Sequence, residues 1–476
     1  MTPILSDESA AITLCAEGAV LSDAGDHATA IARYEQAVNV APAMLELHLI
    51  LANAQQLAAR PLDARATLRR ALRVAERADA VSDFTLGKAL VDAGAGADAV
   101  GCFRRVRAEY PGDVSAAAAL AAALRDAQKP DDAWTEVSAA LRMAPNDPVV
   151  LLTAALIRHD LSDYAGAREF CDRSLEIRPD ASGVHVTRGY LRHLLGDEAG
   201  AWADFESRPL PEPLTAMPRW RGEALDGKSI LVLGEQGVGD QFQFLRFVHH
   251  PSLGAASRVI VACQPDAVSL LRASGYNAVS RDETVFADYY VPMLSLPLLL
   301  GVSGDWRGAG VTYIAATNVA QQPSPRTTRV GLVWAGNPEH RNDAVRSLAP
   351  SLLHGLLHTH PRVQFVSMQH GAAAADLPPG VAEHHDGGDW LATARELCTL
   401  DLLITVDTGI AHLAGALGMS VWLLVPHVPD WRWGASGSRT PWYPSVRLFR
   451  QPERGDWSRV LTNVHAALSG AVLAAR

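Results

Sequence analysis

The chain has 476 residues, 48% hydrophobic and 20% charged, a composition typical of globular protein and a length that allows several domains. It carries 42 Lys and Arg against 52 Asp and Glu, a net charge of −10, which argues against binding nucleic acid or anionic membranes through a basic surface. Five scattered cysteines without a CxxC pair, no signal peptide and no long apolar run indicate a cytoplasmic protein without disulfides, zinc or membrane insertion.

A small residue recurs in the same local setting through the first half of the chain. Its spacings are 34, 35, 34, 34 and 34 residues, and the copies are Ala30, Ala64, Ala99, Ala133, Ala167 and Ala201. The period resembles that of the tetratricopeptide repeat, which implies six pairs of antiparallel helices. We therefore expect an α-solenoid over residues 1–208 whose groove binds a protein acceptor. The alternative is an array that only stabilises or dimerises the chain.

The repeat period ends near Arg208, where RPLPEPLTAMPRW carries four prolines. This segment predicts a domain boundary and a linker over residues 209–228. A buried strand at 229–233, a glycine-rich turn at 234–240 and a helix that begins near Gln241 follow. Such a turn allows backbone amides to approach a phosphate, although the same turn also occurs for steric reasons alone.

Two lobes of alternating strands and helices are expected after this linker. The first covers residues 229–325 and the second covers residues 326–476, and their strands are apolar throughout, as in parallel sheets that are covered on both faces. The predicted strands lie at 229–233, 258–263 and 288–291 in the first lobe and at 330–334, 363–368, 402–406 and 421–425 in the second. The last helix is a candidate to pack back on the first lobe.

The segment LLITVDTGIAHLAGALG carries the sharpest ligand signal. Asp407, Thr408 and Gly409 follow a buried strand and start a helix, at the sheet edge where open α/β folds bind ligands. Thr408 and Gly409 would offer a hydroxyl and N–H groups to a phosphate at the positive helix end, and His412 is placed to donate to a phosphate oxygen. The alternative interpretation makes Asp407 only a helix cap.

Two motifs together carry a family resemblance. The VGD sequence at 238–240 and VDTGIAHLAGALG at 406–418 resemble the heptosyltransferases, which are inverting, metal-independent GT-B glycosyltransferases. With the repeats in front, and with PRWRGE, VPDWRW and PWYPSVRLFRQ, the whole chain resembles bacterial repeat-containing glycosyltransferases. These are distant relatives of the O-GlcNAc transferases and include enzymes that modify flagellin. The resemblance implies a GT-B fold of two Rossmann-like lobes, with the acceptor on the first lobe and the nucleotide sugar on the second.

The resemblance also implies roles for individual residues. Asp240 is the candidate general base, and Asp407 is expected to contact the donor, whereas the family's diphosphate-binding lysine has no counterpart here. Arg341 and Arg346 are the alternatives for its place. The remaining donor-binding candidates are Gly237, Gly239, Asn337, Thr408, Gly409 and His412. Trp431 and Trp433 either stack on a base or a sugar or only pack, and no metal or cofactor beyond the donor is expected.

The implied activity is transfer of a sugar to a Ser or Thr hydroxyl of a protein, with flagellin as the preferred acceptor. A nonulosonic acid delivered as its CMP conjugate is one donor that fits. A six-repeat groove is larger than a small sugar acceptor requires, which favours a protein. The alternatives are a heptosyltransferase-like step in surface-polysaccharide assembly and a non-catalytic flagellin-binding scaffold.

Overall fold

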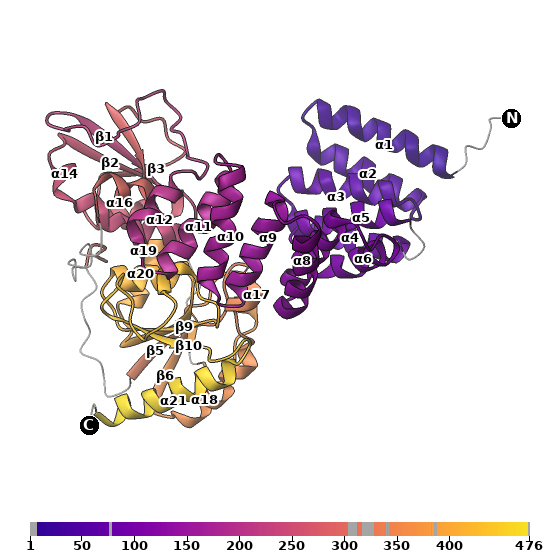
Figure 1. Cartoon of the computed structure of the whole chain (residues 1–476). Helices are drawn as coiled ribbons and strands as arrows, with labels where there is room; N and C mark the ends of the chain where they lie inside the picture. Colours follow the sequence, from indigo (N-terminus) through magenta and orange to yellow (C-terminus); the bar gives the residue numbers. More distant parts are fainter. Residues whose placement is uncertain are drawn as a thin grey trace. The chain divides into compact units, whose positions relative to one another are not determined.

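The computed structural model describes residues 7–75, 79–302, 312–316, 328–338, 340, 342–381, 383–384 and 388–474 (Figure 1). The chain forms two compact units, which we call the first unit (Met1–Val184) and the second unit (His185–Arg476). The first unit is helical, and the second contains two parallel sheets. None of the described helices is both long and apolar enough to cross a membrane.

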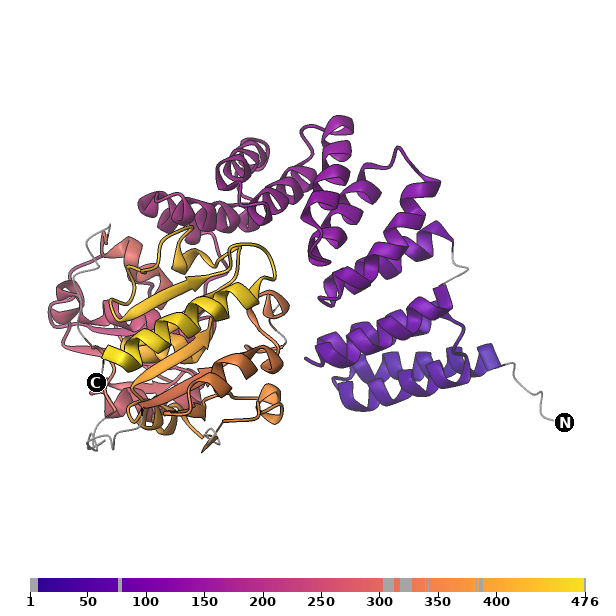
Figure 2. The same cartoon turned by 90° about the horizontal axis from the view of Figure 1, so that it is seen from below.

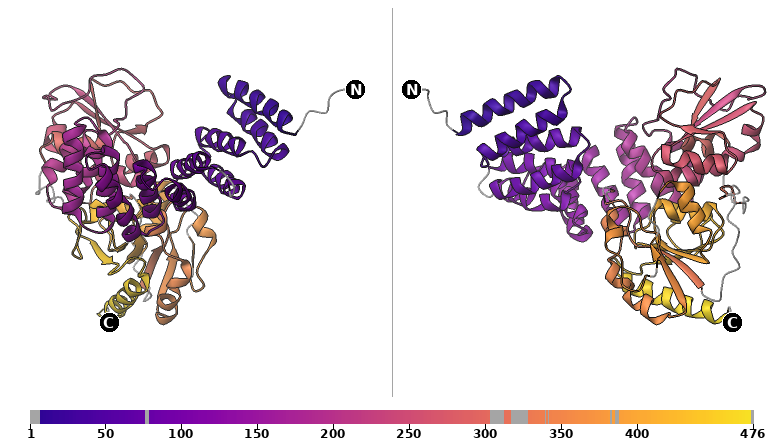
Figure 3. Two further views of the ribbon diagram at one scale, coloured as in Figure 1. Left: turned by 45° about the vertical axis from the view of Figure 1, so that its right-hand side comes forward. Right: turned by 180° about the vertical axis from the view of Figure 1, so that it is seen from behind.

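The first unit consists of successive helix pairs, which Figure 3 shows stacked on one another. Each pair joins two helices of similar length through a short turn. The helices are α1 (Asp7–Asp23), α2 (His27–Val40), α3 (Leu45–Leu57), α4 (Pro61–Val74), α5 (Ala80–Asp92), α6 (Gly96–Glu109), α7 (Val114–Asp126), α8 (Pro130–Met143), α9 (Pro148–Asp160) and α10 (Tyr164–Ile177). A sixth pair, α11 (Ser182–Leu194) and α12 (Glu198–Phe205), continues the pattern.

The predicted repeat register is confirmed helix by helix. Each of the six repeated alanines is the fourth residue of the second helix of its pair, and each is at most 1% exposed. The residue four positions later is buried in every pair, as Phe103 is. It packs close to the first helix: a Cβ on Gly87 would lie 2.7 Å from the Phe103 ring. Small and large residues thus alternate at the contact between the two helices of a pair. This repeated contact is typical of a tetratricopeptide-repeat solenoid.

The turn between the two helices of a pair is also repeated. One residue in each turn has a positive φ, and these residues are Gly25, Ala59, Gly94, Gln128, Ser162 and Gly196. An aspartate then caps several of the second helices: the carboxylates of Asp26 and Asp163 accept hydrogen bonds from Thr29 N and Gly166 N. The turn therefore uses one left-handed residue and one cap to reverse the chain.

The boundary between the units differs from the predicted boundary at residue 208. It falls between Val184 and His185, inside α11. Most of α11 and all of α12 therefore belong to the second unit. The physical reason is that aromatic and charged side chains of this last pair pack on the α/β part, as described below.

The predicted linker over 209–228 is partly built into the first sheet. Trp220 N donates to Tyr290 O at 2.8 Å, and Tyr290 N donates to Pro218 O at 3.0 Å. The Trp220 side chain is 2% exposed. The prolines exclude a helix from this segment, as the sequence predicted. Its backbone groups, which therefore have no partners within a helix, bond instead to the edge strand of the first sheet.

The first lobe holds a four-stranded parallel sheet of order β3-β2-β1-β4. Its strands are β1 (Ser229–Leu233), β2 (Arg258–Cys263), β3 (Ala278–Ser280) and β4 (Tyr289–Pro292). Its helices are α13 (Val238–Phe244), α14 (Pro251–Gly254), α15 (Val268–Ala273) and α16 (Leu296–Leu299). Leu231 pairs with Ile260 and with Tyr290, so β1 lies at the centre of the lobe, where its continuous apolar sequence is buried.

The second lobe holds a six-stranded parallel sheet of order β10-β9-β8-β5-β6-β7. Its strands are β5 (Thr328–Val333), β6 (Val363–Ser367), β7 (Glu383–His384), β8 (Leu402–Val406), β9 (Val421–Val425) and β10 (Val446–Arg450). Its helices are α17 (Asp343–Arg346), α18 (His354–Thr359), α19 (Trp390–Leu397), α20 (Gly409–Ala416) and α21 (Trp457–Ala474). The last helix packs on this sheet (Figure 2): Trp457 and Val464 share one core with Phe365.

Candidate functional site

The strand order fixes where each lobe can bind a ligand. In both sheets the lobe's first strand lies between its second and fourth strands, an order shared with Rossmann folds. Ligands bind such sheets at the carboxyl end of the first strand, where the strand order reverses. In the first lobe this place is the loop after β1, residues 234–237. In the second lobe it lies between the loops after β5 and β8, which carry Asn337 and Asp407.

Asp240 lies in the first turn of α13. The helix begins at Val238, three residues before the predicted start at Gln241, so Gly239 and Asp240 are helical. The Asp240 carboxylate explains the earlier start, because its Oδ2 accepts a hydrogen bond from Gly237 N at 3.0 Å and closes the first turn. Gly237 has an extended conformation at the cap position.

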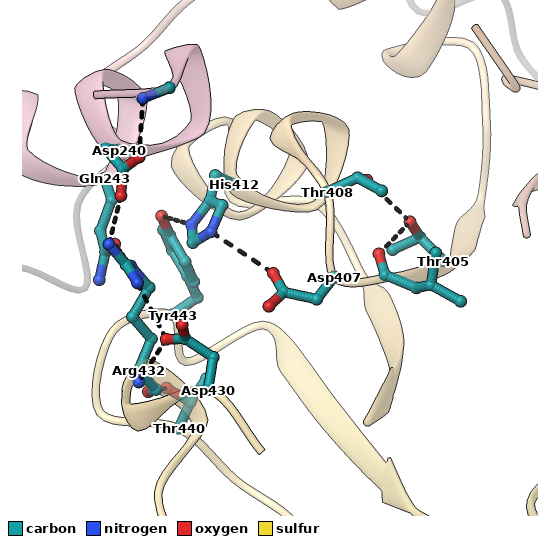
Figure 4. Close-up of polar contacts among 12 residues, drawn as sticks. Asp240, Gln243, Thr405, Asp407, Thr408, His412, Asp430, Arg432, Thr440 and Tyr443 are labelled. Carbon is teal, nitrogen blue, oxygen red and sulfur yellow. Dashed lines mark hydrogen bonds and ion pairs between the residues drawn. The ribbon is translucent and has the colours of Figure 1, made fainter. Parts of the chain in front are cut away.

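Arg432 links the two lobes at this place (Figure 4). It lies in a short 3-10 helix, Trp431–Trp433, after β9. Its Nη2 forms an ion pair with Asp240 Oδ1, its Nε donates to Gln243 Oε1 at 2.8 Å, and its Nη1 donates to Asp430 Oδ1 at 2.9 Å. Although burial opposes the shift, the negative charges of Asp430 and Asp240 raise the pKa of Arg432. The guanidinium is therefore a permanent cation between two carboxylates.

Asp407 stands at the end of β8 and is largely buried, with a side chain 17% exposed. Burial, together with the charge of Asp430, raises the pKa of Asp407 to about 6. Its Oδ1 lies 3.8 Å from Nε2 of His412. Asp407 is not the residue at the cap position of α20, which is Thr408. A carboxyl group with this pKa changes its charge close to neutral pH.

His412 lies inside the packing of α20 rather than at its surface. It is 5% exposed, and its Nδ1 forms a hydrogen bond with the Tyr443 hydroxyl at 2.9 Å. Burial, followed by the charge of Arg432, lowers the pKa of His412 to about 3, so the imidazole is neutral at physiological pH. Its ring stacks on Trp433 with centroids 5.2 Å apart. The imidazole thus positions Tyr443 and lies beside Asp407, while direct donation to a ligand stays a prediction.

The first turns of α13 and α20 touch each other through glycine. A Cβ on Gly239 would lie 3.0 Å from His412 Cδ2 and 3.1 Å from Gly409 Cα. A Cβ on Gly409 would lie 3.2 Å from Val238 Cγ1. The motifs VGD and VDTG therefore come together in space. The amides of Ala411 and His412 donate to Thr408 O, whereas those of Gly409 and Ile410 have no carbonyl one turn earlier in their own helix to accept them.

The loop after β5 supplies a further cation. Arg346, at the end of α17, lies against Gly336, because a Cβ there would be 2.5 Å from Arg346 Nη2. Its Nε is 3.4 Å from Asp343 Oδ1. The charge of Arg346 acts on the Asp407 carboxylate as well, opposing the rise of its pKa that burial and Asp430 produce. Asn337 is exposed in this loop, and Arg341, the alternative cation, lies outside the described residues.

The tryptophans of this region are buried. Trp431 and Trp433 are 6% and 1% exposed. Trp433 packs on His412, and Trp431 packs on rings from the sixth repeat, His193 among them. Both indoles therefore pack on protein rings, and stacking on a base or a sugar stays a prediction.

Sequence reasoning missed Arg432, Asp430 and Gln243, and it named Tyr443 only as part of an aromatic cluster with Trp431, Trp433 and Trp442. The signal was present in VPDWRW, where two opposite charges two residues apart interrupt an otherwise apolar segment directly after a strand. Gln243 gave no signal, because only the fold brings it to Arg432. Among the described residues no cluster of His, Cys, Asp and Glu is arranged to hold a metal ion.

The first unit is thus a tetratricopeptide-repeat solenoid, and the second is an α/β unit with two Rossmann-ordered sheets. No family model matches the chain. Protein FlbA of Caulobacter vibrioides is 25% identical to it over 447 residues, which cover 77% of this chain and 74% of FlbA.

Solved structures give likenesses to the repeats. A tetratricopeptide repeat protein from Parabacteroides merdae is 17% identical, covers 42% of this chain and 81% of its own, and gives a TM-score of 0.35. PilF of Pseudomonas aeruginosa is 19% identical, covers 42% and 90%, and gives 0.29. YrrB, described as a tetratricopeptide-repeat protein with an unusual peptide-binding site, is 19% identical, covers 37% and 89%, and also gives 0.29.

Proposed function

We propose that the second unit is an inverting, metal-independent glycosyltransferase of the GT-B type and that the repeats recruit its protein acceptor. The observation that carries the proposal is the meeting of two loops at the carboxyl ends of β1 and β8. Together with the segment after β9, which carries Arg432, they bring Asp240, Arg432 and Asp407 to the first turn of α20. Carboxylates, a fixed cation and helix amides are the groups that sugar transfer from a phosphate donor requires.

In the proposed reaction the acceptor hydroxyl oxygen forms a bond to the anomeric carbon, and the bond from that carbon to the donor phosphate breaks. The hydroxyl proton moves to a carboxylate, and the electron pair of the broken bond stays on the phosphate. The amides of Gly409 and Ile410 and the guanidinium of Arg346 are the groups that would stabilise the charge on the departing phosphate.

Two carboxylates compete for the role of the base. The resemblance assigns it to Asp240, but both Asp240 oxygens already have partners, Arg432 and Gly237 N. Asp407 has a pKa of about 6, close to the value at which a general base works best near neutral pH. If Asp240 is the base, Arg432 must release it when the acceptor binds. If Asp407 is the base, Asp240 instead fixes Arg432.

A protein acceptor is proposed because the chain devotes six successive helix pairs to tetratricopeptide-type repeats. Tetratricopeptide-repeat solenoids present extended concave surfaces that suit peptides and proteins. Flagellin, and a nonulosonic acid from its CMP conjugate, rest on the resemblance to repeat-containing glycosyltransferases.

The test is intact-mass spectrometry of flagellin from cells that carry the wild-type chain, Asp407→Ala or Asp240→Ala. Loss of the base is expected to lower transfer by about 10² to 10⁴, so a discrete mass increment should disappear in the variant that lacks it. Asp226→Ala is the matched control, because Asp226 is exposed and precedes β1 at the opposite edge of the sheet.

The outcomes separate the alternatives. Equal flagellin masses in all folded variants and wild type would overturn the proposal for flagellin and favour a polysaccharide acceptor or a scaffold. A pH profile of the transfer rate tests Asp407 as the base. With Asp407 as base the rate should fall as the pH drops through about 6, because its carboxylate then takes up a proton.

A further inference from the structure

The sixth repeat is joined to the loops of the candidate site by three separate contacts. It is the pair α11 and α12, and most of it belongs to the second unit. The loops are those after β1, after β4 and after β9, which follow the carboxyl ends of their strands. Such contacts are not needed to close a repeat, because a terminal helix pair requires only a polar outer face.

The first contact is an aromatic stack on the loop after β9. The imidazole of His193 lies parallel to the Trp431 indole, with centroids 4.3 Å apart and planes inclined by 18°. Trp202 and Phe205 from α12 also contact the Trp431 ring, at 5.7 and 5.6 Å. Trp431 is adjacent to Arg432, the cation that holds Asp240. Fixing the indole therefore fixes the guanidinium.

The imidazole in this stack is neutral. Burial, followed by the positive charge of Arg432, lowers the pKa of His193 to about 3. The ring therefore carries no charge at physiological pH and contributes as a flat apolar surface. A phenyl ring can supply the same surface, which makes the contact open to a rescue experiment.

The second and third contacts come from Arg208, just after α12. Its Nε and Nη2 donate to Glu235 Oε2 and Oε1 at 2.9 and 2.7 Å, in the loop after β1. Its Nη2 also donates to Ser295 Oγ at 3.1 Å, in the segment after β4. Glu235 Oε1 in turn accepts Leu294 N at 2.9 Å. One buried guanidinium thus fixes both loops that flank the strand-order reversal of the first sheet.

We propose that the sixth repeat is part of the active unit, with His193 and Arg208 as positioning residues for the loops that carry Arg432 and Glu235. The assignment of those loops to catalysis rests on the proposed function. The contacts by which His193 and Arg208 fix the loops do not depend on it. Most of the last helix pair is therefore part of the second unit, and an acceptor bound to this part would lie on the unit that carries the site.

The experiment is amide hydrogen exchange of the full chain, read at Trp433 and Gly434. Their amides donate to Asp430 O and Trp431 O, so their protection reports whether the 3-10 helix is held. In His193→Ala, exchange there should be roughly three- to tenfold faster, the factor for loss of one aromatic pair. His193→Phe should restore wild-type protection.

A matched control is available in the fifth repeat. His159 occupies the position one repeat earlier, near the end of α9, and its ring contacts Tyr164 within the first unit. His159→Ala should leave exchange at Trp433 and Gly434 unchanged. Unchanged protection in His193→Ala, failure of His193→Phe to rescue, or an equal effect of His159→Ala would each overturn the proposal.

A kinetic measurement ties the hold to the site. Where wild type transfers a sugar to flagellin, His193→Ala should lower kcat and leave the KM for flagellin unchanged, because the repeat surface itself is intact. A rise of KM alone would make His193 an acceptor contact and contradict positioning. Absence of transfer by wild type would sink the proposed function, while the exchange result would still decide the hold on the loop.

Discussion

The contact between Gly239 and His412 is the tightest point at which the two motifs meet. Alanine at 239 would place its Cβ 3.0 Å from His412 Cδ2 and 3.1 Å from Gly409 Cα, and the backbone of Gly409 cannot swing away. We expect Gly239→Ala to lower the free energy of unfolding of the second unit by about 1–3 kcal/mol, the usual range for overpacking. Urea unfolding followed by tryptophan fluorescence measures it, since all tryptophans except Trp134 lie in this unit.

Gly254→Ala is the control for this substitution, because no atom lies within 4 Å of a Cβ there. It should leave stability within about 0.5 kcal/mol of wild type. An equal loss of unfolding free energy in both variants would mean that the packing of α13 on α20 is not the cause of the destabilisation.

Two buried histidines predict how stability depends on pH. The pKa values of His193 and His412 fall to about 3 in the folded protein, so their contribution is full above pH 6.5 and is lost as the pH falls from there towards 3. Asp407, with a pKa of about 6, acts in the opposite direction below pH 6 because the folded state then binds its proton. Net stability should therefore decline from about pH 6.5 downwards.

The His193→Phe variant isolates one of these protons. Its loss of stability between about pH 6.5 and 5 should be smaller than that of wild type, by up to about 1.4 kcal/mol per pH unit. Urea unfolding at several pH values gives the comparison. Parallel pH dependence in the two chains would show that His193 takes up its proton in the folded state.

Individual residues were predictable only where a motif surrounds them. Asp407, Thr408 and Gly409 could be placed at a sheet edge because an apolar strand stops directly before them. Arg432 could not, since its partners Asp240 and Gln243 stand about 190 residues earlier, and sequence spacing carries no information on contacts between lobes.

At the scale of the helix pair, the left-handed turn position is occupied by glycine in some copies and by a residue with a Cβ in others. Gly25 and Ala59 occupy equivalent places with φ of 82° and 56°. A left-handed conformation costs a residue with a Cβ about 1–2 kcal/mol, and glycine loses about 0.5–1 kcal/mol in chain entropy. Ala59→Gly should therefore stabilise the first unit by about 0.5–1 kcal/mol, and Gly25→Ala should destabilise it by a similar amount. Unfolding of the helices followed by circular dichroism tests both.

The expected loss of stability in Gly25→Ala comes from backbone conformation and not from a steric clash, because nothing lies within 4 Å of a Cβ at Gly25. Gly112→Ala serves as the control, since it also meets no atom but its φ is not positive. Gly112→Ala should not lower the free energy of unfolding of the first unit. A loss at Gly112 as large as that at Gly25 would contradict the left-handed turn as the cause.

Elements were predictable in proportion to their apolar length. The strands expected at 229–233, 258–263, 402–406 and 421–425 coincide with β1, β2, β8 and β9, because a central parallel strand is apolar throughout. Three edge or near-edge elements escaped. The strand β10 reads VRLFR and carries two arginines, while β3 and β7 are only three and two residues long.

At the scale of the whole chain, the position of the unit boundary decides which truncation is informative. A cut at residue 208 follows the repeat period, but it removes Arg208 and the rings that cover Trp431. Glu235, which is 6% exposed, would then be left as a buried charge without its cation. Breaking such a pair costs about 3–5 kcal/mol, so loss of activity in that fragment would say nothing about acceptor recruitment.

We therefore expect two fragments to differ sharply. A chain of residues 182–476 keeps the sixth repeat and should unfold cooperatively in urea, with a midpoint close to that of the second unit in the full protein. A chain of residues 210–476 should unfold at much lower urea, or expose apolar surface without denaturant. If the shorter fragment proves as stable as the longer one, the sixth repeat is dispensable to the α/β unit. If only the longer fragment folds, its transfer activity separates the two acceptor hypotheses. An enzyme of polysaccharide assembly would keep its transfer rate. A protein glycosyltransferase would no longer modify flagellin but would still catalyse sugar transfer.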